Sequence, residues 1–330
     1  MNIDLIVDVD INARVLPRWS IMGVEAMHVL RPVHVYPAPF HYIIVTMTPR
    51  WQLLLYHLLL VVLAVRSEET AGCNSEQDDQ CTRTYQWIPE AEHPCNIPKF
   101  SIQELKSRFG PRGLPSLYHE PIIIQGGQGR NEKFLNIASQ QGIVASFTPN
   151  FEITLSSSNS FSAHRRTIPL SQYLDEILET GETTPDQLAN ETWYLFGETY
   201  SQEWKQVLQH YELPPCQTCV DSLVALSFGI GNRGSGVQWH VHGPGFAEAL
   251  WGRKHWILYP ADEKPDFHPD QTSRNWMEYT YPTLNKRPYE CTLNAGELIY
   301  FPNMWWHATI NLDEYTSFVS TFTTEHNAFD

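Results

Sequence analysis

The sequence contains few basic residues. Lys and Arg account for 22 of its 330 residues and Asp and Glu for 37, which gives a formal net charge of -15 at pH 7. Non-specific nucleic-acid binding depends on cationic contacts with phosphate, so this balance and the lack of a basic run argue against a nucleic-acid partner. Apolar residues make up 42% of the chain and charged residues 18%, as in globular rather than disordered proteins.

The sequence also lacks an apolar run long enough for a regular transmembrane helix. Residues 51–65 form its most apolar segment and would span about 22 Å as a helix, less than the ~30 Å hydrocarbon core. Arg50 before this segment and small residues after it are typical of a signal peptide over residues 47–67, with translation starting at Met47. Residues 1–46 would then be an upstream extension. An uncleaved signal-anchor is the alternative, whereas cleavage would leave no stable membrane span.

Cysteine is absent from the chain before and within this apolar segment. All six cysteines follow it, and an even number of cysteines behind a signal peptide predicts disulfides in an oxidising compartment. The candidates are Cys73, Cys81, Cys95, Cys216, Cys219 and Cys291. The sequence leaves their pairing open, although the CxxC spacing of Cys216 and Cys219 favours a local disulfide over a redox-active pair. Asn190, in an Asn-Glu-Thr motif, is a candidate glycosylation site, and we expect the protein in the endoplasmic reticulum lumen or secreted.

The rest of the chain divides into a cysteine-containing leader, residues 68–100, and one domain, residues 101–330. The capping box of residues 101–104 predicts a short helix, and apolar residues at helical spacing predict two more, over 170–178 and 204–211. Short runs rich in Val, Ile, Leu and aromatic residues then alternate with turn residues. The predicted strands are 121–124, 222–230, 246–250, 255–259, 290–293, 297–301, 307–311 and 317–322. This pattern predicts an α+β fold dominated by a sandwich or barrel of short strands.

Three histidines form the strongest candidate site. His240 and His242 lie two residues apart, so on a strand both would point to the same side, and His307 follows on a distant predicted strand. Imidazole is the commonest ligand for transition metals in proteins, so these residues predict a metal site. An empty, vestigial cluster is the alternative interpretation.

The residues around these histidines resemble two signatures of the cupin family. Gly234 stands six residues before His240, and Gly296, Pro302, His307 and Asn311 follow the second signature, with Met304 where an inner glycine is usual. The segments 252–260, 295–302 and 305–307 are similar to the jumonji-C (JmjC) branch, whose members include Fe(II)- and 2-oxoglutarate-dependent oxygenases. The resemblance covers roughly residues 95–325. It implies a double-stranded β-helix, or jelly-roll, with helical additions at its N-terminal side.

The resemblance also implies roles for single residues. His240 and His307 match the two metal-binding histidines of the family, and His242 stands where the family has a carboxylate ligand. Lys254 matches the basic residue that pairs with the distal carboxylate of 2-oxoglutarate; a solvated charge beside a strand is the alternative. Val237 replaces a threonine that helps to hold that co-substrate. Glu248, with five residues between it and His242, does not fit the family spacing, and we expect it at the surface of a strand.

These departures affect the expected chemistry. Three neutral imidazoles would leave the full charge on a divalent metal such as Fe(II), Zn(II) or Ni(II), and Val237 makes 2-oxoglutarate a doubtful co-substrate. We therefore predict a JmjC-domain protein of the secretory pathway with a degenerate metal site, a non-conventional or inactive relative that acts by binding proteins. The alternative is an active metal-dependent oxygenase or hydroxylase of a secretory-pathway protein or small molecule. The signal peptide, the cysteines and the acidic charge argue against histone demethylation.

Overall fold

The computed structural model describes residues 5–7, 43–45, 95–116, 118–126, 129–178, 182–221 and 223–323. The chain divides into two compact units, Met1–Cys81 and Thr82–Asp330. In the first unit, strand β1 (Leu5–Val7) pairs antiparallel with β2 (Ile43–Val45). The predicted signal peptide and the cysteines Cys73 and Cys81 lie outside the described residues, so these expectations stay predictions.

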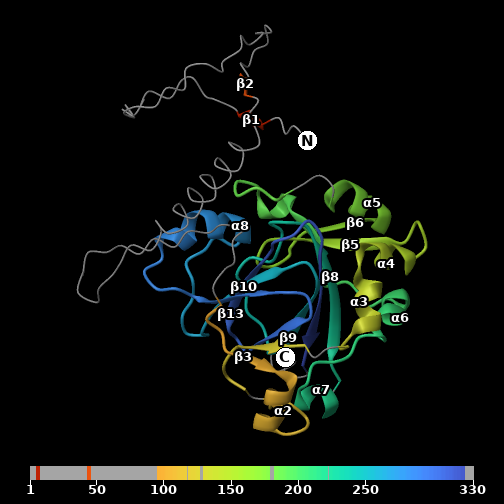
Figure 1. The fold of residues 1–330 in the computed structure, drawn as a ribbon, viewed down its shortest axis with the longest axis vertical. Coiled ribbons are helices and arrows are strands. Elements are labelled where there is room, and N and C mark those ends of the chain that lie inside the picture. Colours follow the sequence, from red (N-terminus) through yellow and green to blue (C-terminus); the bar gives the residue numbers. More distant parts are fainter. Residues whose placement is uncertain are drawn as a thin grey trace, which may run out of the picture. The chain divides into compact units, whose positions relative to one another are not determined.

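The second unit is a strand-rich α+β structure built around a nine-stranded sheet (Figure 1). Neighbouring strands of this sheet are antiparallel except β3 and β4, which are parallel. Their order is β3 (Lys99–Ser101), β4 (Ile122–Gln125), β12 (Glu297–Phe301), β9 (Gly245–Trp251), β14 (Thr316–Phe322), β8 (Ala225–Gly231), β7 (Trp193–Leu195), β5 (Glu152–Ser157) and β6 (Arg165–Pro169).

A second sheet has three antiparallel strands in the order β11 (Tyr289–Leu293), β10 (Lys254–Tyr259) and β13 (Trp306–Asn311). All eight strands that the sequence predicts are present, with ends that differ by a few residues. Strands β3, β5, β6 and β7 were not predicted. They are short, or polar residues interrupt the alternation of apolar and polar residues from which a strand is predicted.

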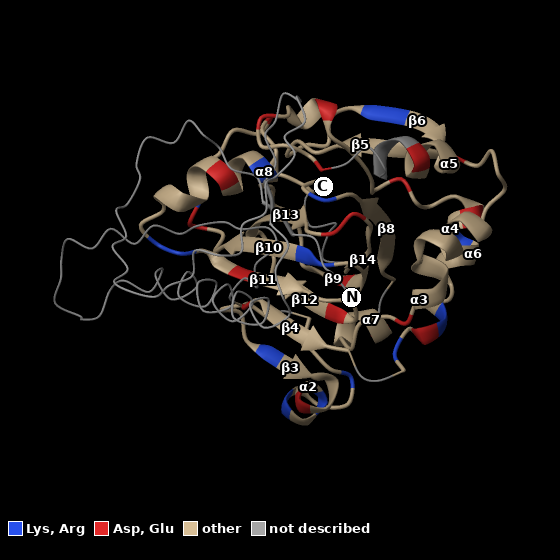
Figure 2. Ribbon diagram, turned by 45° about the horizontal axis from the view of Figure 1, so that its top comes forward, with Lys and Arg blue, Asp and Glu red and all other residues tan. Residues whose placement is uncertain are grey.

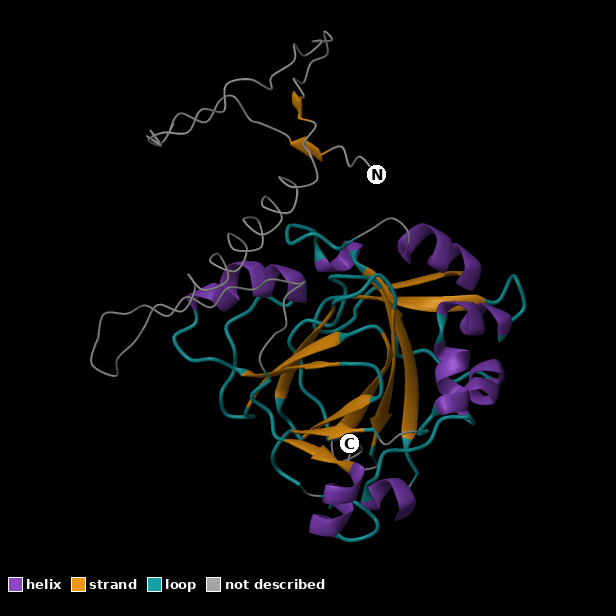
Figure 3. Ribbon diagram, in the orientation of Figure 1, coloured by secondary structure: helices purple, strands orange, loops and turns teal. Residues whose placement is uncertain are grey.

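The helices between residues 132 and 208 pack against the outer face of the nine-stranded sheet, whereas the short helix at residues 273–275 packs against the three-stranded sheet (Figure 3). The predicted capping box begins α2: the Ser101 N–H donates to Glu104 Oε2 at 2.7 Å, and Gly110 ends the helix with a φ of 92°. The predicted helix over 170–178 is divided between α5 and a π-helical turn, and the one over 204–211 ends at Leu208. The α-helices are α2 (Ile102–Phe109), α3 (Glu132–Ala138), α4 (Gln140–Ala145), α5 (Leu170–Gln172), α6 (Gln202–Leu208), α7 (Gln217–Asp221) and α8 (Ser273–Asn275), and the π and 3-10 turns are η1 (Tyr173–Leu178), η2 (Ala189–Glu191), η3 (Trp276–Thr280) and η4 (Tyr281–Thr283).

Strand β14 shows how the two faces of the large sheet differ. Val319 packs among the residues of α3, α4 and α6, whereas Phe318, Ser320 and Phe322 line a pocket on the other face. Successive side chains of a strand point to opposite faces, so this alternation separates the helix-covered core from the interior between the sheets. A further cluster that includes Trp256 joins strands of both sheets.

Two disulfides lie in the described part of the chain. Cys95 pairs with Cys291 on β11, and Cys216 pairs with Cys219 at α7, as the CxxC spacing predicted. No helix among the described residues is long and apolar enough to cross a membrane. Figure 2 shows basic and acidic residues interspersed along the described ribbon, without a large area of one sign.

Candidate metal and anion site

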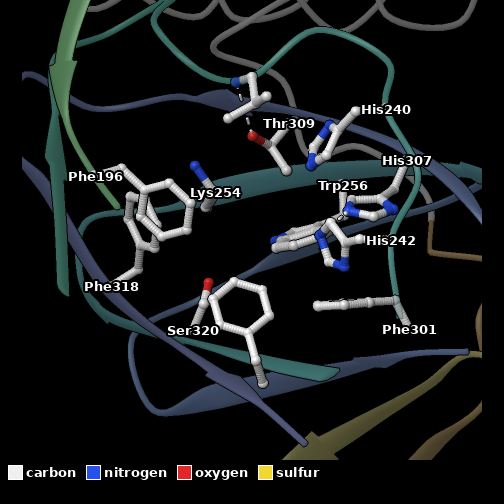
Figure 4. A pocket seen from close by; sticks show the side chains of 12 residues that line it. Phe196, His240, His242, Lys254, Trp256, Phe301, His307, Thr309, Phe318 and Ser320 are labelled. Atoms are coloured by element: carbon white, nitrogen blue, oxygen red, sulfur yellow. Dashed lines mark hydrogen bonds between the residues drawn. The ribbon is translucent and has the colours of Figure 1, made fainter. Parts of the chain in front are cut away.

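A pocket lies between the two sheets (Figure 4). Strands β10 and β13 contribute residues from the three-stranded sheet, and β14 and the end of β12 contribute residues from the nine-stranded sheet. The lining residues are mostly aromatic, with a few polar groups: Phe196, Val237, His240, His242, Lys254, Trp256, Phe301, His307, Thr309, Phe318, Ser320 and Phe322. A small ligand would therefore meet apolar walls and a few fixed polar contacts.

The structure brings the three predicted histidines together. His307 lies on β13, but His240 and His242 lie on an irregular segment between β8 and β9, so the assumption that these two histidines share one face of a strand is wrong. Two backbone hydrogen bonds between His240 and His307, of 3.1 and 3.0 Å, hold this segment against β13. Gly236 makes the approach possible, because a Cβ at this position would lie 2.0 Å from Thr309 O.

Backbone carbonyls set the tautomer of each histidine. Nδ1 of His240 lies 2.9 Å from Gln238 O, Nδ1 of His242 lies 2.8 Å from Gly243 O, and Nδ1 of His307 lies 2.9 Å from Trp305 O. A carbonyl oxygen only accepts hydrogen bonds, so each Nδ1 carries the proton. In neutral rings, the lone pair is then on Nε2, which is the arrangement of metal-binding histidines whose second nitrogen is held by a backbone carbonyl.

The distances between these rings fit a shared metal ion. One nitrogen from each of the three rings can be chosen so that all lie within 4.8 Å of one another, and Nε2 of His242 is 3.1 Å from Nε2 of His307. Two nitrogens at about 2.1 Å from one metal ion are about 3.0 Å apart at a right angle and about 3.4 Å apart at the tetrahedral angle. The observed separation lies between these values, so the residues present fit a divalent transition metal.

Burial favours the neutral, metal-binding form of two of these rings. It lowers the pKa of His240 to about 4, with a smaller contribution from the positive charge of Lys254. Burial also lowers the pKa of His307 well below its ordinary value of 6.5, and the neighbouring rings of His240 and His242 add to this effect. Both imidazoles are therefore neutral at pH 7.

Aromatic rings hold the histidines in place. The ring of Phe301 is stacked on His307 with a centroid distance of 4.9 Å, and Trp256 is stacked on the same imidazole at 5.8 Å. Phe301 and Phe322 meet the His242 ring edge-on, at 5.3 and 5.4 Å. These aromatic residues were not predicted as part of the site, although each alternates with outward-facing neighbours on a predicted strand.

Lys254 is buried inside the pocket, with 2% of its surface exposed, so the interpretation as a solvated charge is wrong. Its Nζ donates to Asn311 Oδ1 at 2.9 Å and lies 4.0 Å from the centroid of the Phe318 ring. An ammonium group has three donors, so a bound anion could accept the others. Burial lowers the pKa of Lys254 to about 7.

Two hydroxyl groups that the sequence analysis missed also line the pocket, Thr309 on β13 and Ser320 on β14. The Val237 N–H donates to Thr309 Oγ1 at 3.2 Å, so the Thr309 hydroxyl is next to the position where the family has its threonine. A hydroxyl that accepts one hydrogen bond still has its own proton to donate. Thr309 and Ser320 therefore offer polar contacts that the Val237 side chain does not.

The sequence pattern of the cupin-like domain matches residues 128–327, which is more than half of the chain. The chain belongs to the cupin-like family. It is 43% identical to JmjC domain-containing protein 8 of Mus musculus over 205 residues, which are 62% of this chain and 74% of that protein. It is 42% identical to JmjC domain-containing protein 8 of Homo sapiens over 204 residues, which are 61% of this chain and 75% of that protein. It is 30% identical over 167 residues to lysine-specific demethylase JMJ21 of Arabidopsis thaliana, 44% of this chain and 16% of that protein.

Met304 occupies a strained position in this cupin-like domain. Its φ of 58° is in the left-handed region, which glycine adopts more easily than methionine. The Met304 N–H donates to His242 O at 2.9 Å, so this turn holds the segment that carries His242. The left-handed backbone is a physical reason for the glycine that the cupin signature usually has here.

Glu248 is not a surface residue, as the sequence analysis expected, but is buried with 1% of its surface exposed. Its carboxylate accepts hydrogen bonds from Arg130 at 2.8 Å, from Asn131 at 3.1 Å and from the Tyr211 hydroxyl at 2.7 Å. It does not line the pocket, so it is no ligand of this site. Asn190 is exposed in η2, and its glycosylation stays a prediction.

Proposed function

We propose that this chain is a metal-binding cupin-like protein in which His240, His242 and His307 hold one divalent transition metal ion. The observation that carries the proposal is that all three Nδ1 atoms meet backbone carbonyls, which leaves the Nε2 atoms as ligands. Fe(II), Zn(II) and Ni(II) all accept imidazole. The metal would supply a Lewis-acidic centre, and the protein would be a non-conventional relative of the Fe(II)/2-oxoglutarate oxygenases.

We propose further that the two sheets are the halves of a double-stranded β-helix. The family match supports this architecture, and so does the position of the pocket between the sheets. In such a fold the irregular segment with His240 and His242 and the strand with His307 meet at one end of the interior, where their backbones pair.

The site would also bind a small organic anion. Three neutral imidazoles leave the charge of a divalent ion uncompensated, and the buried ammonium of Lys254 lies in the same pocket. Both charges attract an anion within low-dielectric surroundings. Thr309 and Ser320 add hydroxyl contacts, while the aromatic walls exclude water from the rest of the ligand.

Oxygenase or hydroxylase activity is a second candidate function. It is favoured by the space beside the histidines, which would leave room for ligands other than imidazole on the metal. Some of the similar proteins are named demethylases, of lysine and of arginine residues. For this chain, the substrate would be a secretory-pathway protein or a small molecule rather than a histone.

We also keep the location and the partners as proposals. The protein would reside in the endoplasmic reticulum lumen or be secreted, and it would bind other proteins there. Two cysteine pairs at disulfide distance in the described residues and the exposed Asn190 support this location.

The metal content of the full chain tests the main proposal. The protein is secreted from a eukaryotic host and purified without chelators or a histidine tag, beside the variants His240→Ala and His307→Ala. Near-stoichiometric metal in the wild type that both variants lack would support the site. No metal in the wild type, even after anaerobic addition of Fe(II) or Zn(II), would contradict it. Oxygen consumption by the iron-loaded protein, with and without 2-oxoglutarate, tests the second candidate.

A further inference from the structure

The Cys216–Cys219 disulfide closes a much shorter loop than the other disulfide of the described residues. Its cysteines have a sequence separation of 3, whereas Cys95 and Cys291 have a separation of 196. A disulfide stabilises a fold mainly by limiting the freedom of the unfolded chain, and this effect grows with the length of the closed loop. The fold therefore depends far less on Cys216–Cys219, and breaking and re-forming this bond costs it little.

Hydrogen bonds hold the backbone around this disulfide without the help of the sulfur atoms. The Leu114 N–H donates to Pro215 O at 2.9 Å, on one side of Cys216. On its other side, the Gln217 N–H donates to Leu114 O, also at 2.9 Å. A Cβ on Gly113 would lie 2.0 Å from Pro215 O, so the two segments are in close contact. The two cysteines would therefore stay near each other after reduction, in position to re-form the bond.

The two sulfur atoms of this disulfide have different surroundings. The Cys219 N–H donates to Cys216 Sγ at 3.0 Å. Cys219 is the more exposed residue, with 6% of its surface accessible against 2% for Cys216. A hydrogen bond to sulfur favours the thiolate, and a sulfur stabilised as thiolate is the better leaving group in disulfide exchange. An incoming thiolate would therefore attack Cys219 Sγ and release Cys216 as the thiolate.

Apolar side chains are exposed next to this disulfide. Leu213, Val220 and Leu223 each lie within four residues of one of its cysteines, and Leu223 is 89% exposed. We call these three residues the apolar rim. The disulfide itself packs with α2 in a hydrophobic cluster that shares no residue with the histidine pocket (Figure 1). Exposed apolar side chains beside a reactive group are typical of a surface that receives another polypeptide.

We infer that Cys216 and Cys219 form a second reactive site, which passes its disulfide to a cysteine pair of another polypeptide that docks on the apolar rim. The first thiolate of the partner forms a bond to Cys219 Sγ, the Cys216–Cys219 bond breaks, and its electron pair goes to Cys216. The second thiolate of the partner then attacks the partner's own sulfur in this mixed disulfide and releases Cys219 as the thiolate. The partner loses two electrons and two protons, which the two cysteines gain as thiols.

The CxxC spacing alone favours a local disulfide over a redox-active pair. The hydrogen bond to Cys216 Sγ and the apolar rim, which only the structure shows, favour exchange with a partner. The metal ion has no part in this reaction, so metal content should be the same in the variant Cys216→Ser/Cys219→Ser as in the wild type.

A reduced peptide tests the inference on the oxidised full chain. The peptide is synthetic and has two cysteines flanked by leucines, and chromatography measures its oxidised form. We expect the Cys216–Cys219 disulfide to be lost as oxidised peptide forms, while Cys95–Cys291 is retained as the internal control. Mass spectrometry after alkylation assigns each thiol to its cysteine. The variant Cys216→Ser/Cys219→Ser should form one equivalent less of oxidised peptide than the wild type.

Two further variants test the apolar rim. Val220→Ser/Leu223→Ser leaves the sulfur atoms in place and removes apolar contacts with the peptide. It should slow the reaction with the peptide about tenfold, because two partly buried apolar contacts are lost, and leave the reaction with the small thiol glutathione unchanged. Val144→Ser is the matched control. Val144 is also exposed, but it lies on α4, whose Ile143 belongs to a different hydrophobic cluster, so both rates should stay as in the wild type.

Three results would overturn the inference. The first is a Cys216–Cys219 disulfide that stays oxidised with excess peptide. The second is equal loss of both disulfides, because the sulfur atoms would then react through unfolding. The third is a reaction with the peptide that is as fast in Val220→Ser/Leu223→Ser as in the wild type. In the reduced protein, alkylation of Cys216 should show a pKa below the ~8.5 of an ordinary thiol and below that of Cys219. The reverse order would contradict Cys216 as the leaving group.

Discussion

Two buried polar clusters lie on opposite faces of the nine-stranded sheet, and they differ in how completely their groups are paired. On the helix-covered face, both oxygens of the Glu248 carboxylate accept hydrogen bonds, from Arg130, Asn131 and Tyr211, although Nε of Arg130 has no partner among the described residues. In the pocket, the ligand nitrogens of the three histidines lie close together. The Trp256 Nε1–H has no acceptor, and the Lys254 ammonium has only one, among the described residues. A carboxylate whose two oxygens are both paired holds the fold together, whereas unused donors and metal-ligand nitrogens that line one pocket indicate a binding site.

A third cluster supports this distinction. Glu290, on β11, has no exposed surface, and its carboxylate meets His255, Tyr281 and Arg287. His255 precedes Trp256 on β10 and therefore faces away from the pocket. Like the Glu248 cluster, this one joins segments distant in the sequence and has acceptors matched by donors. Buried charge alone thus does not mark the functional site of this molecule.

The largest expected effect comes from Glu248→Ala. This change leaves the largely buried Arg130 side chain, which is 9% exposed, without its nearest carboxylate. The free energy of unfolding of the metal-free protein should fall by about 3–5 kcal/mol, as for other broken buried ion pairs. Urea denaturation measures it, and metal bound per folded molecule should stay unchanged. In the control Glu198→Ala, which breaks an exposed pair with Arg165, the loss should stay below about 1 kcal/mol. Equal losses in the two variants would contradict a structural role of the Glu248 cluster.

His307→Ala should have the opposite pattern to Glu248→Ala: a large loss of metal affinity and a small loss of stability. Removing one of three imidazole ligands should weaken metal binding by at least about 100-fold, because changes outside the ligand shell already cost 10–100-fold. The unfolding free energy of the metal-free protein should fall by only about 1–2 kcal/mol, since no buried charge is left unpaired. Competition with a chromophoric chelator measures the affinity. The exposed His164→Ala serves as control, and a metal affinity that His307→Ala leaves intact would rule out the three-histidine site.

The sequence predicted the residues of the histidine pocket better than those of the Glu248 and Glu290 clusters. His240, His242 and His307 belong to motifs with regular spacing, and alternation along predicted strands places pocket residues on one face. Glu248 also alternates correctly, but its partners Arg130 and Asn131 lie more than 110 residues away in a segment without periodicity. The prediction that Glu248 lies at the surface was wrong, because a charged side chain can be buried only when such distant partners pair with it.

Other features could not be predicted because they depend on the backbone rather than on residue type. The tautomers of the histidines follow from carbonyls at neighbouring positions on an irregular segment, where a strand was expected. The unpaired donor of Trp256 follows from the rotamer and the packing of the indole against Phe301. The contact of Lys254 with Asn311 needs the register of β10 and β13, which the sequence does not specify.

Lys254→Met tests the anion side of the pocket. Methionine keeps most of the apolar stem and removes the charged donor, so the affinity of the zinc-loaded protein for 2-oxoglutarate should fall about 30-fold, equivalent to about 2 kcal/mol for a hydrogen bond with a charged group. Zinc content should not change, because Lys254 is not one of the clustered ligands. Calorimetric titration measures the affinity. Lys264→Met, a change at an exposed lysine, should leave it unchanged; the same affinity in Lys254→Met and the wild type would remove Lys254 from the site.

The smallest expected effect is a pH dependence of this affinity. Burial lowers the pKa of Lys254 from 10.5 to about 7, so the ammonium that attracts the anion is present below pH 7 and is lost as the pH rises above it. Affinity for 2-oxoglutarate should therefore fall about tenfold from pH 6 to pH 8, because the fraction of charged lysine falls by that factor. The other titratable groups that line the pocket are the histidines, and they are the same in Lys254→Met. That variant also retains any effect of hydroxide on the metal, so the difference between the two pH profiles isolates Lys254. Parallel profiles would mean that the lysine stays charged up to pH 8, and that the pocket is more open to water than its aromatic walls indicate.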